Sequence, residues 1–130
     1  MIFIDTGVII AFHNPYDQHH KDAVTILQRY SDHDRFITDF IFDEAVTLTL
    51  ARGTHTKAVA VGTSILHGDL RMIKVGERLF SKAWNLFHRF EAFSFTDCTT
   101  LATLELFHIK KIATFDSEFE KIKGIEVVRS

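Results

Sequence analysis

Several features that are common in other protein classes are scarce in this chain of 130 residues. The single cysteine, Cys98, excludes an intrachain disulfide and points to a reducing compartment, so we expect a cytoplasmic protein. One proline and six glycines leave little room for flexible linkers. No stretch approaches the roughly 20 apolar residues of a membrane span, and no basic residues precede the first apolar run as in a signal peptide. We therefore expect one domain that covers residues 1–130 and no membrane association.

An excess of positive charge is also missing, because the formal net charge is −2 with the eight histidines taken as neutral. A nucleic-acid partner would need local basic residues or metal ions, since the protein as a whole would not attract its phosphates. Apolar residues make up 46% of the chain and charged residues 25%, which is ordinary for a globular domain. Thirteen phenylalanines predict a core filled largely by aromatic side chains.

The first eleven residues, MIFIDTGVIIA, contain a short apolar run that ends in one acid, Asp5. Residues 2–4 are apolar at every position, which is typical of a strand buried on both faces in a parallel sheet. A carboxylate at the carboxyl end of such a strand lies where open α/β sheets bind ligands. Asp5 either caps the following turn or holds a cation, and this stretch alone leaves both readings open.

Helical and strand patterns alternate along the rest of the chain. Helices are expected over residues 6–12, 17–30, 39–52, 54–67, 76–91 and 97–107, and strands over 36–37, 70–75, 112–115 and 125–128, with a helical turn over 117–121. Thr38 or Asp39, Thr54 and Thr96 are the expected N-caps of three of these helices. The alternation predicts a three-layer α/β/α fold with a central, mostly parallel sheet of about five strands.

Four acids fall at corresponding places in this plan. Asp5 ends the first strand, Asp116 follows the strand over 112–115, and Asp97 opens the helix before that strand. Glu44 lies one turn into the helix after the second strand, and helical side chains lean toward the N-terminus, so it can reach back toward the strand ends. Four carboxylates at one sheet edge repel each other unless a cation neutralises them, and oxygen ligands favour Mg²⁺ or Mn²⁺.

These residues resemble the PIN-domain ribonucleases, and in pattern the toxins of VapBC toxin–antitoxin pairs. The similarity rests on four segments in order, each with one of the four acids: IFIDTGVIIA, ITDFIFDEAVTL, FSFTDCTTLATLE and IATFDSEFEKIKGIEVV. Each segment alone is a weak signal, whereas their order and spacing along the whole chain are fairly specific.

The resemblance implies a metal-dependent ribonuclease that hydrolyses RNA phosphodiesters with one or two Mg²⁺ or Mn²⁺ ions, and an antitoxin protein as its partner. Asp5, Glu44 and Asp97 match the core acids, and Asp116 matches the most variable fourth acid. The implied mechanism is in-line attack by a metal-activated water. By the same resemblance Thr6 and Thr114 match hydroxyl positions near the metal, although both can be plain turn or strand hydroxyls. Asp43, next to Glu44, is a secondary candidate, but its side chain points about 100° away on a helix, which favours a solvated or hydrogen-bonding residue.

Basic and apolar stripes suggest two further surfaces. Arg52, Lys74, Arg78 and Lys82 are candidate RNA contacts, with a plain solvated helix face as the alternative for the last three. The helix after Thr54 is more apolar around its girth than one buried stripe requires, so we expect a homodimer.

Two alternative functions remain at this point. A housekeeping RNA-processing nuclease would carry the same acids, and a non-catalytic PIN-like scaffold would bind RNA or protein without cutting. A zinc site is disfavoured, because the eight histidines show no paired spacing with the lone Cys98 and fit exposed helix ends and loops. Cys98 itself fits a buried thiol better than a nucleophile.

Overall fold

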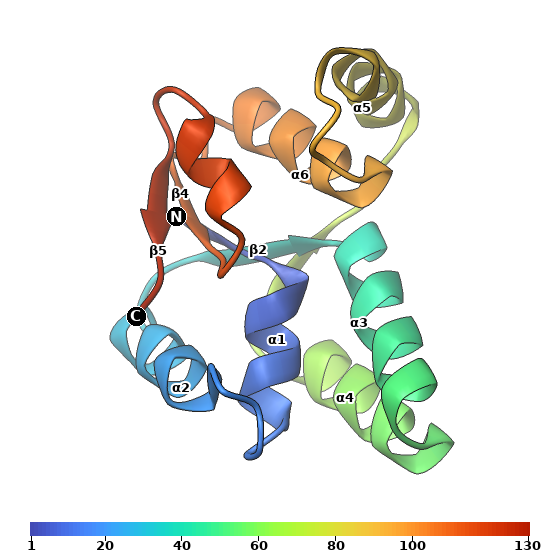
Figure 1. The fold of residues 1–130 in the computed structure, drawn as a ribbon, viewed down its shortest axis with the longest axis vertical. Helices are drawn as coiled ribbons and strands as arrows, with labels where there is room; N and C mark the ends of the chain where they lie inside the picture. Colours follow the sequence, from blue (N-terminus) through green and yellow to red (C-terminus); the bar gives the residue numbers. More distant parts are fainter.

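Five parallel strands form one sheet in the order β3-β2-β1-β4-β5 (Figure 1). The computed structural model describes residues 1–130. The strands are β1 (Ile2–Ile4), β2 (Arg35–Thr38), β3 (Arg71–Ile73), β4 (Lys111–Ala113) and β5 (Glu126–Val128). The predicted three-layer α/β/α architecture with about five parallel strands is confirmed.

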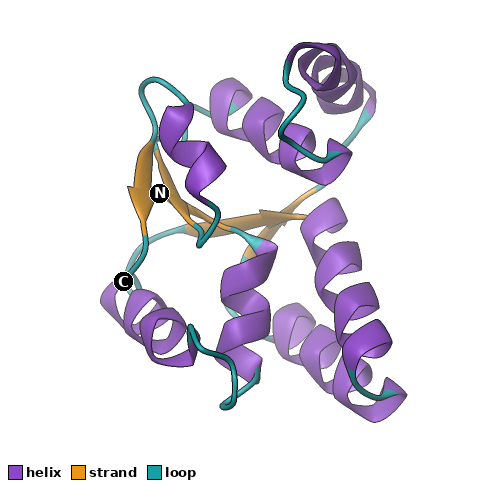
Figure 2. Ribbon diagram, viewed as in Figure 1, coloured by secondary structure: helices purple, strands orange, loops and turns teal.

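Six α-helices and one 3₁₀ turn connect the strands (Figure 2). They are α1 (Thr6–His13), α2 (His20–Arg29), α3 (Asp39–Arg52), α4 (His55–His67), α5 (Glu77–Arg89), α6 (Phe95–Leu106) and η1 (Ser117–Lys121). In Figure 1, α1 to α4 lie below the sheet and α5 and α6 lie above it. None of the helices is both long and apolar enough to cross a membrane.

The winding of the sheet reverses at its middle strand, β1. The chain runs from β1 through β2 to β3 on one side, then crosses to β4 and β5 on the other. Such a reversal leaves a crevice beyond the carboxyl ends of the two central strands, here β1 and β4, and ligands of open α/β sheets bind in that crevice. Asp5 directly follows β1, so the fold places its carboxylate there.

The core is aliphatic, and the prediction of a largely aromatic core is wrong. Only Phe3, Phe93 and Phe119 of the thirteen phenylalanines are buried. Isoleucine, valine, leucine and alanine from the strands and the inner helix faces supply most of the continuous core. Leu79 and Leu86 take the inner face of α5, which leaves the aromatic side chains of that helix on its outer face.

Most element boundaries lie within a few residues of the prediction, and one difference concerns the site. The predicted cap of α6 was Thr96, but Ser94 caps this helix. The Ser94 hydroxyl accepts from the Asp97 amide at 3.0 Å, and the Asp97 carboxylate accepts from the Ser94 amide at 3.0 Å. This reciprocal capping box outcompetes a cap at Thr96 because it satisfies two free amides at once.

Candidate active site

Asp5 sits at the carboxyl end of β1 and is 8% exposed. Its Oδ1 accepts from the Thr6 amide at 2.9 Å, which makes Asp5 the N-cap of α1. Its Oδ2 accepts from the Thr114 hydroxyl at 2.6 Å, from the end of β4. Two neighbouring strands therefore fix this carboxylate, and capping does not exclude a second role because each carboxylate oxygen keeps a further lone pair.

Asp97 and Asp116 also combine capping with exposure to the crevice. Asp97 is the third residue of α6 and uses Oδ2 in the capping box with Ser94. Asp116 caps η1, since its Oδ1 accepts from the Glu118 amide at 2.9 Å. Thr114 links this residue to Asp5, because its hydroxyl also accepts from the Asp116 amide at 3.0 Å. Helix N-termini favour carboxylates, so the folding of these turns holds negative charge at one place.

Glu44 reaches the same crevice from α3, whereas its neighbour Asp43 does not. The Asp43 carboxylate is exposed and accepts from the Thr47 hydroxyl one turn along the helix at 3.2 Å. Asp43 is thus a solvated hydrogen-bonding residue in this structure, as the helical spacing suggested.

The four acids, Asp5, Glu44, Asp97 and Asp116, line one open cavity of about 320 Å³. Thr6, His19, Arg52 and Phe115 contribute to the same wall. None of the four acids takes part in an ion pair within 4.0 Å. The structure therefore brings the four acids together at the carboxyl edge of the sheet, where the sequence predicted them.

Burial raises the pKa of the Asp5 carboxyl to about 7, and repulsion from Asp97 and Glu44 adds to the rise. Hydrogen bonds from Thr114 and Thr6 oppose it. Burial likewise raises the pKa of Asp97, with a further contribution from the charge of Asp116. The cavity thus concentrates more negative charge than its surroundings compensate, which is the electrostatic setting that attracts a cation.

The donor set fits a hard divalent ion that keeps part of its water. As the side chains stand, no three of them are close enough together to ligate one ion directly. Mg²⁺ usually takes only one or two carboxylates directly and retains several waters, so widely set acids suit it. The Thr6 hydroxyl is buried beside Asp5 without a hydrogen-bond partner, so it is an unused polar group at the wall of this cavity. These observations make Mg²⁺ or Mn²⁺ a good match for the cavity.

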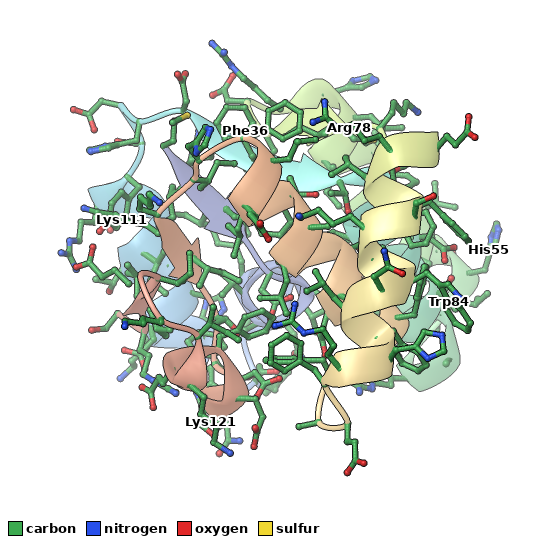
Figure 3. The ribbon with its side chains drawn as sticks, turned by 90° about the horizontal axis from the view of Figure 1, so that it is seen from above. Phe36, His55, Arg78, Trp84, Lys111 and Lys121 are labelled. Atoms are coloured by element: carbon green, nitrogen blue, oxygen red, sulfur yellow. The ribbon has the colours of Figure 1, made fainter.

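Of the four predicted RNA contacts, only Arg52 lies at this cavity. Lys74 precedes α5 rather than continuing its surface, so it does not form one helical row with the others. Lys82 pairs with Glu105 at 3.0 Å, and Arg78 is exposed at the start of α5 (Figure 3). None of these three lines the cavity, and their contact with RNA stays a prediction.

His19 lines the cavity, whereas the sequence pattern suggested only exposed helix ends and loops for the histidines. Its ring stacks on Phe115 with the centroids 4.3 Å apart. The amide of His19 donates to the Asp17 carboxylate at 2.8 Å and so closes a turn before α2. An aspartate two residues before His19 is a sequence pattern from which this turn could have been predicted. Cys98 is buried, and burial raises the pKa of its thiol, so it is not an activated nucleophile.

Residues 2–125 match the family described as PIN domain. Among solved structures, the fold matches the VapC20 toxin of Mycobacterium tuberculosis, described as cleaving the sarcin-ricin loop, with a TM-score of 0.84 and 27% identity over 92% of this chain and 93% of that one. It also matches VapBC2 of Rickettsia felis bound to promoter DNA, with a TM-score of 0.75 and 12% identity over 98% and 97% of the two chains. A toxin–antitoxin complex from Klebsiella pneumoniae matches with a TM-score of 0.70 and 15% identity over 96% and 95%. A comparison with curated protein sequences gives no match.

Proposed function

The chain belongs to the PIN-domain family, and on that premise we propose that it is a Mg²⁺- or Mn²⁺-dependent ribonuclease that acts as the toxin of a toxin–antitoxin pair. The observation that carries the proposal is the convergence of four carboxylates, without any compensating ion pair, at the crevice where the sheet reverses its winding. The similarity to a toxin that cleaves an RNA loop supports RNA as the substrate class.

Asp5, Glu44 and Asp97 would hold the ion, directly or through water, with Asp116 as the fourth acid. Bound there, the ion would polarise a phosphoryl oxygen and lower the pKa of a bound water to make a nucleophile. Thr114 fixes the orientation of the Asp5 carboxylate by donating to Oδ2. Arg52 adds the one cationic side chain of the cavity wall, which suits a phosphate of the substrate.

The test is metal-dependent RNA cleavage by the purified protein. We expect cleavage with Mg²⁺ or Mn²⁺, complete inhibition by EDTA, and recovery when metal is restored in excess. Asp5→Asn should lower the rate about a hundredfold or more, since it removes a carboxylate from the ion. Glu126→Gln, at the opposite edge of the sheet, is the matched control and should cleave normally. Cleavage that survives EDTA, or equal rates in Asp5→Asn and wild type, would contradict the proposal.

The same assay addresses the two alternatives. A non-catalytic scaffold would bind RNA with no cleavage under any metal condition. A housekeeping nuclease would cleave, but its expression would not arrest growth and no neighbouring short reading frame would encode an antitoxin. We favour the toxin because the structural neighbours include toxin–antitoxin complexes.

We also propose that the protein forms a homodimer. The inner face of α4 packs against α3, while Val59 and Leu66 of α4 are 51% and 61% exposed. A second exposed apolar surface lies on α5, where Phe80 and Trp84 are about half exposed and the Trp84 ring stacks on Phe87 with the centroids 5.8 Å apart. Sedimentation of Leu66→Ser and Trp84→Ser identifies the face involved, and a monomeric wild type at micromolar concentration contradicts the proposal.

A further inference from the structure

A second, larger cavity of about 580 Å³ adjoins the acidic one. It lies between the end of α1, the α1–α2 turn and the α3–α4 hairpin. Neither the four acids nor the proposed hydrolysis accounts for it. We call it the flanking pocket and define it by His13, Tyr16, Arg52 and Lys57, which line it together with apolar residues of α1, α3 and α4.

The flanking pocket is continuous with the acidic cavity. Ile10, Asp17, Leu48 and Arg52 line both. The reason is the course of the two helices that leave the sheet edge side by side in Figure 1, α1 and α3. Glu44, Leu48 and Arg52 follow one another at four-residue spacing on α3, so this row leads about 12 Å outward from the acidic cavity along the helix axis. A strand held at the acids therefore has a path into the flanking pocket.

The flanking pocket is lined by two cations, Arg52 and Lys57, and one acid, Asp17, whereas the acidic cavity is lined by five acids and Arg52. Arg52 and Lys57 are exposed, and neither belongs to any of the seven ion pairs of the structure. Lys57 lies in the first turn of α4, where a cation is unfavourable to the helix dipole and no acid offsets it. Gly62 lies close to Val46 and Phe42, which lets α4 pack closely on α3, and Arg52 and Lys57 stand on either side of the short loop between the two helices.

Tyr16 supplies an aromatic face at the rim of the same pocket. Its side chain is 96% exposed, although burial is the usual fate of so large a ring. The turn before it is ordered, because the Tyr16 amide donates to the Asn14 side chain at 3.1 Å and Pro15 restricts the backbone. An exposed ring on an ordered turn beside free cations is the combination that binds single-stranded nucleic acid, with bases on the ring and phosphates on the cations.

We propose that the flanking pocket binds the RNA strand next to the scissile phosphodiester, with Tyr16 stacking on a base and Lys57 and Arg52 contacting its phosphates. This inference rests on the proposed function for the identity of the substrate. It assigns Tyr16 and Lys57 to substrate binding and not to the chemical step. The favoured substrate is single-stranded, because a base must be unpaired to stack on a side chain.

The test measures the affinity of a fluorescein-labelled single-stranded RNA 12-mer for the Asp5→Asn protein, which binds without cutting. Adding Tyr16→Ala should raise Kd about tenfold, and Tyr16→Phe should keep the wild-type affinity. Lys57→Ala should weaken binding and lower the slope of log Kd against log salt by about 0.7, as expected for one lost phosphate contact to a single strand. In the catalytically intact protein the same changes should raise KM and leave kcat within about twofold.

Phe107→Ala and Lys110→Ala are matched controls, because both residues are exposed and lie at the amino-terminal edge of the sheet, away from the acids. If wild type cleaves RNA but the pocket variants bind RNA as well as these controls do, the flanking pocket does not bind the RNA strand. A polypeptide partner would then be the better candidate for the flanking pocket. If wild type does not cleave but binding depends on Tyr16 and Lys57, the subsite stands and the proposed hydrolysis fails. No measurable binding at low salt overturns the subsite.

Discussion

The two edges of the sheet treat charge in opposite ways. At the amino-terminal edge, charged residues that begin the strands form ion pairs across neighbouring segments. These pairs are Arg35 with Asp69 at 3.7 Å, Arg71 with Asp34 at 3.1 Å, and Lys111 with Glu126 at 3.6 Å. Lys111 lies at the periphery of the molecule in Figure 3. At the carboxyl-terminal edge, four acids share one cavity and have no ion-pair partner.

The charges at the amino-terminal edge are paired and have a structural role, whereas we propose a functional role for the unpaired acids at the carboxyl-terminal edge. Exposed ion pairs contribute about 0–1 kcal/mol each, and the three pairs leave the amino-terminal edge locally neutral. The carboxyl-terminal edge keeps Asp5 buried beside other acids at a cost to the fold, and the raised pKa of Asp5 records that cost. A cation bound in this cavity would reduce the repulsion between the acids, so we expect changes at the carboxyl-terminal edge to have larger effects than changes at the amino-terminal edge.

The largest effect on stability is expected from Asp5→Asn in metal-free buffer. The pKa of Asp5 rises from 3.8 to about 7 on folding, which corresponds to about 4 kcal/mol at most. Between these pH values the folded state binds more protons than the unfolded state, so wild-type stability should fall as pH rises from about 4 to about 7. Asp5→Asn should make this fall much smaller, leaving the contribution of the raised pKa of Asp97, and should be more stable than wild type at pH 8. Urea denaturation in EDTA at pH 5 and pH 8 measures it, and a wild type that gains stability over this range contradicts the account.

Mg²⁺ should stabilise the wild type by about 3 kcal/mol when its concentration is a hundred times Kd, which raises Tm by several degrees. The gain arises because the ion neutralises the repulsion among the acids of the folded state. Differential scanning calorimetry with and without Mg²⁺ should show no rise in a Glu44→Gln, Asp97→Asn double variant. An equal rise in that variant would place the ion elsewhere.

Thr114→Val should lower metal-dependent cleavage about tenfold at neutral pH. The change removes the hydrogen bond to Oδ2 of Asp5, which holds the carboxylate in place and opposes the rise of its pKa. The pH at which activity reaches half its maximum should therefore move upward. Thr114→Ser keeps the hydroxyl and should restore both rate and profile, whereas equal losses in Ser and Val would indicate a packing defect.

The smallest effect is expected at the paired edge. Arg71→Met removes the exposed ion pair with Asp34 and should change the free energy of unfolding by less than about 1 kcal/mol. Cleavage should stay at the wild-type rate, because the pair lies at the opposite end of the strands. A large loss of activity in this variant would contradict the claim that only the carboxyl-terminal edge of the sheet takes part in cleavage.

The sequence was sufficient to predict the architecture and the meeting of four acids at one edge of the sheet, because both follow from short-range patterns. An apolar run that ends in an acid specifies a buried strand and the residue at its carboxyl end, as for Asp5. Parallel strands end at one edge, so the other acids could be placed without knowing the packing of the helices. For Asp5 the sequence left capping and cation binding open as alternatives, whereas in the structure Asp5, Asp97 and Asp116 each cap a helix or turn and still converge on one cavity.

What the sequence could not supply depends on how helices pack. The basic row of Lys74, Arg78 and Lys82 assumed one continuous helix, but α5 begins after Lys74 and Lys82 finds Glu105 on α6. The flanking pocket is lined by Tyr16 from the α1–α2 turn and Lys57 from α4, and no local sequence pattern signals that these two residues share a pocket. The number of phenylalanines could not reveal which face of α5 they occupy, and this is why the aromatic core was wrongly predicted.

The most direct test of the acidic edge as a metal centre is anomalous diffraction from crystals soaked in Mn²⁺. We expect a peak between Asp5, Glu44 and Asp97, within reach of Asp116, and its loss in Asp5→Asn crystals treated in the same way. Mn²⁺ bound elsewhere on the protein while this cavity shows no peak would contradict this expectation.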